Sequence, residues 1–199
     1  MWSEDDSFRR RLIKEVALKL FSQFGFHKTS LEEIATNAGI KKQSIYYYYP
    51  NKEAIFDEIV LETARELLQN VDQKIDPNLP AIEKYLMFTQ LIYEELKNHA
   101  KQIGKVVTPD FIEYTPHGRP IVDKIRLLLK DRLRVILKEG QEQGIFNIEN
   151  EELTLDALME MANFIRMRWL IFHDEKRCDQ IVREMNRIVL DGLKVRKDQ

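Results

Sequence analysis

The segment from Thr29 to Pro50 constrains this chain most, because its pattern predicts two short helices joined by a tight turn. Ser30 and Glu33 have the spacing of a capping box, in which each side chain accepts a hydrogen bond from a backbone N–H at the start of a helix. The apolar residues that follow recur at helical spacing, namely Leu31, Ile34 and Ala35. Gly39 suits the turn after a helix, and Pro50 ends a second one. This is the pattern of a helix-turn-helix, whose second helix can lie in the major groove of DNA.

The predicted second helix carries side chains that suit contacts with nucleic acid. Lysine pairs with phosphate or guanine, glutamine pairs with adenine, and hydroxyl groups donate to phosphate oxygens. All three kinds occur here, at Lys41, Lys42, Gln43, Ser44, Tyr46 and Tyr47. These residues alone leave an alternative, in which a solvated polar turn is followed by tyrosines of the protein core. The same choice between phosphate contact and a solvated face applies to Arg9, Arg10, Arg11 and Lys14 near the start of the chain.

Residues 10–55 resemble the N-terminal domain of the tetracycline-repressor (TetR) family of bacterial transcriptional regulators. The resemblance is carried, in order, by Ile13, Ala17, Leu20, Phe21, Gly25, Thr29, Ser30, Ile34, Ala35, Ala38, Gly39, Ile40, Ile45, Tyr46, Pro50, Lys52 and Glu53. It implies an all-α protein of about nine helices. Residues 1–52 would form a three-helix, helix-turn-helix DNA-binding domain, and residues 53–199 a larger helical domain for effector binding and dimerisation.

Residue chemistry and the resemblance together predict a set of DNA-contacting residues. The set is Lys28, Thr29, Ser30, Lys41, Lys42, Gln43, Ser44, Tyr46, Tyr47 and Lys52, of which Lys52 meets phosphate by resemblance alone. The chain departs from the family pattern at three positions. Lys41 replaces a small hydroxyl residue, Gln43 replaces a frequent glycine, and Tyr48 replaces a frequent histidine. These departures leave the operator sequence open.

The charge distribution agrees with a protein that meets DNA at one end. The chain has 199 residues and a net charge of −2, so the whole molecule has no basic footprint. Residues 1–52 hold nine Lys/Arg and six Asp/Glu, whereas residues 53–199 hold 22 Lys/Arg and 27 Asp/Glu. The N-terminal segment is therefore basic and the rest of the chain acidic. A single cysteine, Cys178, fits a reducing compartment, and no apolar run reaches the length of a membrane span. We therefore expect a soluble, cytoplasmic protein without a signal peptide.

Apolar periodicity and helix stop signals predict the remaining helices. The first helix should run over 7–24, with an apolar face of Phe8, Leu12, Ile13, Val16, Ala17, Leu20, Phe21 and Phe24. Two prolines within 76–80 make the clearest break in the chain. The other helices are expected at 52–74, 80–99, 101–107, 119–143, 151–172 and 174–195.

The last two predicted helices favour self-association. Both are long and amphipathic, and both contain small residues that allow close approach. By resemblance, two subunits would pair them in a four-helix bundle, so that a homodimer presents two reading helices to a palindromic operator. The alternative is that both helices only complete the core of one subunit.

A small-molecule effector pocket is predicted between the helices of the larger domain. Such sites are mostly apolar with a few convergent polar groups. The candidates are Tyr85, Phe88, Thr89, Tyr93, Phe111, Tyr114, Asn163, Phe164, Arg166 and Met167, where Phe111 and Tyr114 belong to a proline-bracketed insert. Arg166 could meet an anionic ligand or form an ion pair across a dimer. For every candidate the alternative is a place in the hydrophobic core.

The sequence gives no indication of an enzyme. It lacks the phosphate-binding, zinc-protease, nucleophile-elbow and dinucleotide motifs, and its histidines are far apart. Glu95 and His99 share a helix face, but a single such pair is more typical of a surface contact than of a metal site, so no metal or cofactor is expected. We predict a homodimeric repressor that binds a palindromic operator and is released by a small molecule. The alternatives are an architectural DNA-binding protein without effector, and an all-helical enzyme or carrier that uses the head as scaffold.

Overall fold

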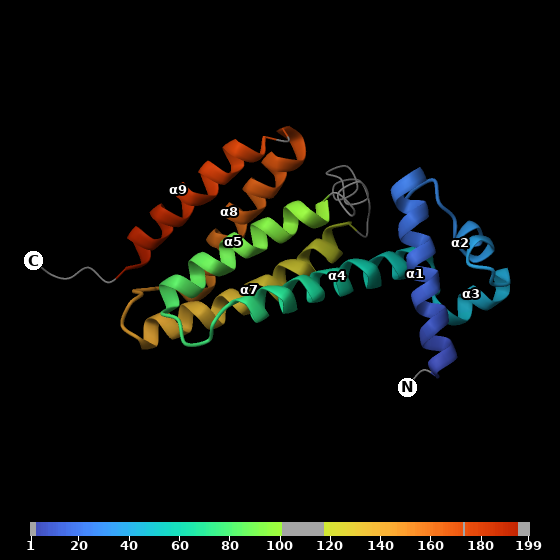
Figure 1. Cartoon of the computed structure of the whole chain (residues 1–199), viewed down its shortest axis with the longest axis horizontal. Helices are drawn as coiled ribbons and strands as arrows, with labels where there is room; N and C mark the ends of the chain where they lie inside the picture. Colours follow the sequence, from blue (N-terminus) through green and yellow to red (C-terminus); the bar gives the residue numbers. More distant parts are fainter. Residues whose placement is uncertain (1–2, 101–117, 173, 195–199) are drawn as a thin grey trace, which may run out of the picture. The chain divides into compact units, whose positions relative to one another are not determined.

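A computed structural model describes residues 3–100, 118–172 and 174–194, and Figure 1 shows their path. The side chains of 96, 98–100, 118–119, 166–167 and 169–172 are outside this description. Within it the chain is all-helical, with one isolated antiparallel bridge between Phe146 and Lys194. The fold class predicted from the sequence is confirmed. The helix expected at 101–107 and the insert with Phe111 and Tyr114 lie outside the described residues.

The chain divides into two compact units, the first built mainly on residues 3–64 and the second on 65–98 and 123–194. The helices of the first unit are α1 (Glu4–Phe24), α2 (Leu31–Asn37), α3 (Lys42–Tyr48) and the first part of α4 (Lys52–Lys74). In Figure 1, α2 and α3 lie beside α1. Three rings join these elements: the centroid of Phe26 is 5.1 Å from that of Phe21 and 5.2 Å from that of Phe56. Around them are the buried side chains of Ile13, Ala17, Ile34, Ile45 and Ile55.

Helix α1 begins earlier than the sequence analysis predicted, at Glu4 rather than residue 7. Ser3 caps it: its hydroxyl accepts from the Asp6 N–H at 3.1 Å, and the Asp6 carboxylate accepts in return from Ser3. We missed this start because aspartate takes the place of the usual glutamate of a capping box. The predicted apolar face was wrong at its ends, since Phe8 is 54% and Phe24 53% exposed. The core of the unit covers only the middle of the helix.

The second unit contains the other part of α4 and four long helices. These are α5 (Ala81–Ala100), α7 (Gly118–Glu142), α8 (Glu151–Phe172) and α9 (Glu175–Leu193), each within two residues of its predicted range. Their caps explain the agreement: Asn150 and Asp174 accept hydrogen bonds from the first turns of α8 and α9, and Gly144 follows α7 with a φ of 67°. The core includes Leu67, Val71, Tyr85, Phe88, Leu133, Leu137, Leu155 and Leu190.

A ladder of ion pairs, which the sequence analysis did not predict, joins α7 to α8. Basic residues four positions apart on α7 meet acidic residues four positions apart on α8. The pairs are Arg126 with Glu160 at 2.6 Å, Lys130 with Asp156 at 2.8 Å, and Arg134 with Glu152 at 2.8 Å. The spacing of four on both helices matches their antiparallel register. In the described part of the chain, none of the helices is both long enough and apolar enough to cross a membrane.

Candidate nucleic-acid interface

The segment after α1 folds into the helix-turn-helix that its sequence predicts. Ser30 and Glu33 form the expected capping box at the start of α2, with 3.2 Å from the Glu33 nitrogen to the Ser30 hydroxyl and 2.7 Å from the Ser30 nitrogen to the Glu33 carboxylate. These hydrogen bonds lower the pKa of the Glu33 carboxyl, and the bond from the Ser30 backbone has the largest effect. Gly39 takes a φ of 64°, where a side chain would be strained, and α3 follows after two residues. The turn therefore holds α2 and α3 in a fixed mutual orientation.

Helix α3 has one buried and one exposed face. Ile45 and, just after the helix, Tyr49 are almost fully buried in the first unit. The other face exposes Lys41, Lys42, Gln43, Tyr46 and Tyr47, with Ser44 half-buried at its edge. Tyr46 and Tyr47 are 54% and 63% exposed, so the alternative that they belong to the core is wrong. Lysines, an amide and two phenols thus share one accessible surface, and side chains of these kinds are frequent in protein–DNA contacts.

The lysine at the first position of α3 has an acidic partner. Lys42 Nζ lies 2.6 Å from Glu32 Oε2 on α2, and both side chains are well exposed. The hydrogen bond to Glu32 raises the pKa of the Lys42 ammonium above its ordinary value. Lys41, the residue before α3, makes no capping hydrogen bond through its side chain.

Two residues of the predicted DNA-contacting set also hold the first unit together. Lys52 Nζ donates to the carbonyl oxygens of Phe26 at 2.8 Å, His27 at 3.3 Å and Thr29 at 2.7 Å. Thr29 is buried, and its hydroxyl donates to the Gly25 carbonyl at 3.0 Å. Their side chains therefore fix the loop between α1 and α2. Of the remaining members, Lys28 is exposed and Ser30 is engaged in its capping box.

The predicted effector residues are not brought together in the described part of the chain. Tyr85, Phe88 and Tyr93 are buried, the first two in the main core of the second unit. The Thr89 hydroxyl accepts from Asn186 of α9 at 2.9 Å. Asn163 and Phe164 are exposed on α8. Phe111 and Tyr114 lie outside the described residues, as do the side chains of Arg166 and Met167.

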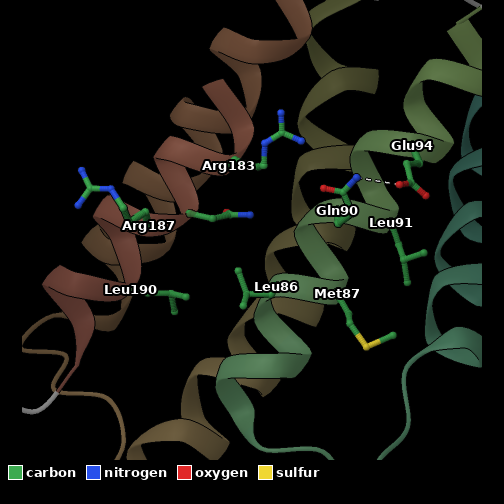
Figure 2. Close-up of a pocket in the computed structure, with 9 residues that line it drawn as sticks. Leu86, Met87, Gln90, Leu91, Glu94, Arg183, Arg187 and Leu190 are labelled. Atoms are coloured by element: carbon green, nitrogen blue, oxygen red, sulfur yellow. Dashed lines mark hydrogen bonds between the residues drawn. The ribbon is translucent and has the colours of Figure 1, made fainter. Parts of the chain in front are cut away.

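A groove of about 590 Å³ opens between α5 and α9 in the second unit (Figure 2). Its lining combines apolar side chains with amide and charged groups: Leu86, Met87, Gln90, Leu91, Glu94, Arg183, Asn186, Arg187 and Leu190. Gln90 donates to Glu94 at 2.7 Å along α5. Arg187 pairs with Glu184 and Asp191 of its own helix. None of the predicted effector residues lines this groove, which is open rather than enclosed.

Outside α3, the described residues include a buried thiol and paired cations. No group of three or more His, Cys, Asp or Glu side chains there could hold a metal ion. Cys178 is a buried thiol, and burial raises its pKa. Arg10 and Lys14, which the sequence predicts to be solvated or phosphate-binding cations, both pair with carboxylates of α4. Only the fold brings these charges together, because the partners are more than forty residues apart in the chain.

Comparisons with known proteins agree with this geometry. The family model for bacterial regulatory proteins of the tetR family matches residues 13–59, which include the whole helix-turn-helix. The HTH-type transcriptional regulator YhgD of Bacillus subtilis is 26% identical over 185 residues, which cover 93% of this chain and 96% of YhgD. The HTH-type transcriptional regulator RutR of Escherichia coli K12 is 50% identical over 201 residues, covering 96% of this chain and 92% of RutR.

Solved structures share the fold over nearly the whole length. A transcriptional regulator of Saccharomonospora viridis, solved in complex with choline, superposes with a TM-score of 0.66 at 16% identity, covering 96% of this chain and 100% of that one. The relatives are transcriptional regulators rather than enzymes. The chain belongs to the TetR family of bacterial transcriptional regulators.

Proposed function

We propose that this protein is a homodimeric repressor that binds a palindromic operator through α3 and is released by a small-molecule effector. In this proposal residues 1–52 are the DNA-reading domain, and residues 53–199 bind the effector and form the dimer. The single observation that carries it is the exposed face of α3, where Lys41, Lys42 and Gln43 stand next to two exposed tyrosines. Lysines neutralise phosphates, and the amide can discriminate bases.

Dimerisation is supported by apolar side chains exposed on the last two helices. Leu153 and Phe164 of α8 are 67% and 57% exposed, and their spacing of three helical turns places them on one face. Ile188 of α9 is 54% exposed, and α8 and α9 pack against each other. A second subunit would cover this exposed stripe of α8, Leu153 and Phe164, together with Ile188 of α9. A two-fold pair would double the bases read and the phosphates contacted.

Effector release is supported by the family alone. The Saccharomonospora viridis regulator binds choline, which shows that a protein with this fold accommodates a small organic molecule. We propose that the effector site lies in the second unit, which holds Tyr85, Phe88, Thr89, Tyr93 and Asn163 of the predicted set. A ligand can shift the DNA-binding equilibrium only through its different affinity for the two states, a coupling of about 1–3 kcal/mol in typical cases.

The proposal is tested by selecting duplexes from a random pool with the purified protein at low salt. We expect an inverted repeat whose half-sites are about one helical turn apart, bound by a dimer in sedimentation experiments. Screening small molecules against that complex should then yield one that lowers the affinity. Selection of no duplex, or tight binding by a single subunit to one half-site, would contradict the proposal.

A further inference from the structure

Arg10 of α1 lies where three elements of the first unit meet. Its Nη1 donates to the carbonyl oxygen of Tyr48 at 2.8 Å, and its Nη2 pairs with the Glu58 carboxylate of α4. The guanidinium carbon is 4.3 Å from the centroid of the Tyr49 ring. The side chains of Arg10 and Glu58 are only 19% and 26% exposed. One guanidinium group thus connects α1, the end of α3 and α4.

The contact with Tyr48 acts on the C-terminal end of the DNA-reading helix. Tyr48 is the last residue of α3, and the last carbonyl groups of a helix lack partners within the helix and carry a partial negative charge. A guanidinium group satisfies such a carbonyl and, being planar, also stacks on an aromatic ring. Tyr49 is buried, so the ring that Arg10 covers is itself held in place. Arg10 therefore fixes the end of α3 by its backbone.

Two further contacts belong to the same face of α1. Asp6 lies one helical turn before Arg10, and its Oδ1 accepts a hydrogen bond from the Tyr48 hydroxyl at 3.2 Å. Lys14, one turn after Arg10, lies 3.2 Å from Glu58 and pairs also with Glu62. The face formed by Asp6, Arg10 and Lys14 therefore joins α3 on one side to α4 on the other. Helix α4 itself continues without a break to Lys74, in the second unit.

We propose that Arg10 is a positioning residue for operator recognition. Through its contacts with Glu58 and with the Tyr48 carbonyl, Arg10 couples the position of α4 to that of α3. It does so without touching DNA. A movement of α4 at Glu58 changes the guanidinium contact that holds the last turn of α3, and with it the angle at which Lys42 and Gln43 face the duplex. This inference rests on the proposed function and adds to it the route by which α4 controls the reading helix.

The test compares five variants of the full-length protein: Arg10→Gln, Arg10→Lys, Glu58→Gln, the double variant Arg10→Gln/Glu58→Gln, and Arg9→Gln. Arg9 is the matched control, because it is exposed and forms its ion pair with Asp5 of its own helix. Affinities for the selected operator and for a random duplex are measured over a range of salt concentrations.

We expect the ratio of the two affinities to fall at least about tenfold in Arg10→Gln and Glu58→Gln. The double variant should be no worse than the singles, because both break one chain of contacts. Arg10→Lys should lose most of the ratio, since an ammonium cannot bridge both partners in a plane.

Three results would overturn the inference. A salt slope on random duplex that falls by about one per subunit in Arg10→Gln would make Arg10 a phosphate ligand. Additive losses in the double variant would mean that Arg10 and Glu58 act separately. If Arg10→Gln keeps the parent's helix content and its ratio of operator to random-duplex affinity, Arg10 has no role in positioning.

Hydrogen exchange separates this inference from the proposed function. In Arg10→Gln the amides of residues 45–49 should exchange faster than in the parent, while those in the middle of α1 keep their protection. If the parent itself prefers no duplex, the proposed function fails and this measurement alone decides the matter. Unchanged exchange at 45–49 would then refute the contact chain.

Discussion

Lys42 of α3 and Glu32 of α2 form an ion pair with 2.6 Å between Nζ and Oε2, on the surface proposed to meet DNA. A phosphate group would have to share or replace that carboxylate. We predict that Lys42→Ala weakens binding to every duplex and lowers the salt slope of the association constant by about one unit per subunit. Fluorescence anisotropy titrations at four or five salt concentrations measure this slope. Lys19→Ala, at an exposed position of α1, is the matched control.

Replacing Glu32, the ion-pair partner of Lys42, should strengthen DNA binding instead of weakening it. Glu32→Gln should strengthen binding by about two- to fivefold, the range expected for removing an exposed ion pair that competes with phosphate. The gain should shrink in the Lys42→Ala background. A salt slope that Lys42→Ala leaves at the parent's value would remove Lys42 from the list of phosphate ligands.

Gln43→Ala should change which bases are preferred rather than how tightly all DNA is bound. Glutamine can accept from and donate to the edge of adenine, and such a pair discriminates by about 1–3 kcal/mol against other bases. The measurement is a panel of operators that differ at one position at a time. Equal losses over the whole panel would show that Gln43 reads no base.

Charged residues on the exposed stripe of α8 should separate the subunits. In Leu153→Asp/Phe164→Asp we expect a folded monomer, seen as a lower sedimentation coefficient with unchanged helix content. Leu127→Asp is the control, because Leu127 of α7 is 57% exposed but outside the stripe. If the parent, the double variant and the Leu127→Asp control sediment alike, the stripe is not the dimer surface.

The capping box of α2 should make its stability depend on pH. The hydrogen bonds from Ser30 lower the folded-state pKa of Glu33 below its ordinary value of 4.5. The stabilisation is therefore complete above that value and is lost as the pH falls through the folded-state pKa. Urea unfolding of Glu33→Gln should show less loss of stability than the parent between neutral and acidic pH, whereas Glu66→Gln of α4 should follow the parent.

The same motif gives a stability prediction at neutral pH. Ser30→Ala removes the hydroxyl that accepts from the Glu33 N–H and should cost about 1 kcal/mol of unfolding free energy. Ser30→Thr, which keeps the hydroxyl, should cost less. Equal losses in both variants would mean that packing rather than the capping hydrogen bond is affected.

Local signals predicted most of the fold. Caps at Ser30, Asn51 and Asn150 and the glycines at 39 and 144 mark helix ends in the sequence, and the structure uses each of them. The exposed ends of α1 could not be predicted in this way. Apolar periodicity gives the direction in which Phe8 and Phe24 point, but the neighbouring elements end before reaching them.

The candidate site was predictable only where a residue's role is local. The exposed face of α3 follows from helical spacing around the buried Ile45. The partners of Arg10, Lys14 and Lys52 come from other helices or loops, so their roles required the tertiary structure. The buried Tyr85 and Phe88 show the same limit, since an aromatic at helical spacing fits a pocket wall and a packed core equally well.

The ammonium of Lys52 has consequences for its chemistry. An ammonium carries three hydrogens, and here three carbonyl oxygens accept them, with the ring of Phe26 4.6 Å away. Acylation requires the side-chain nitrogen to reach the reagent, so this nitrogen must first leave its carbonyl partners. Lys52 should accordingly resist covalent labelling while Lys28 and Lys41 react, and its modification would report that the loop between α1 and α2 has come apart.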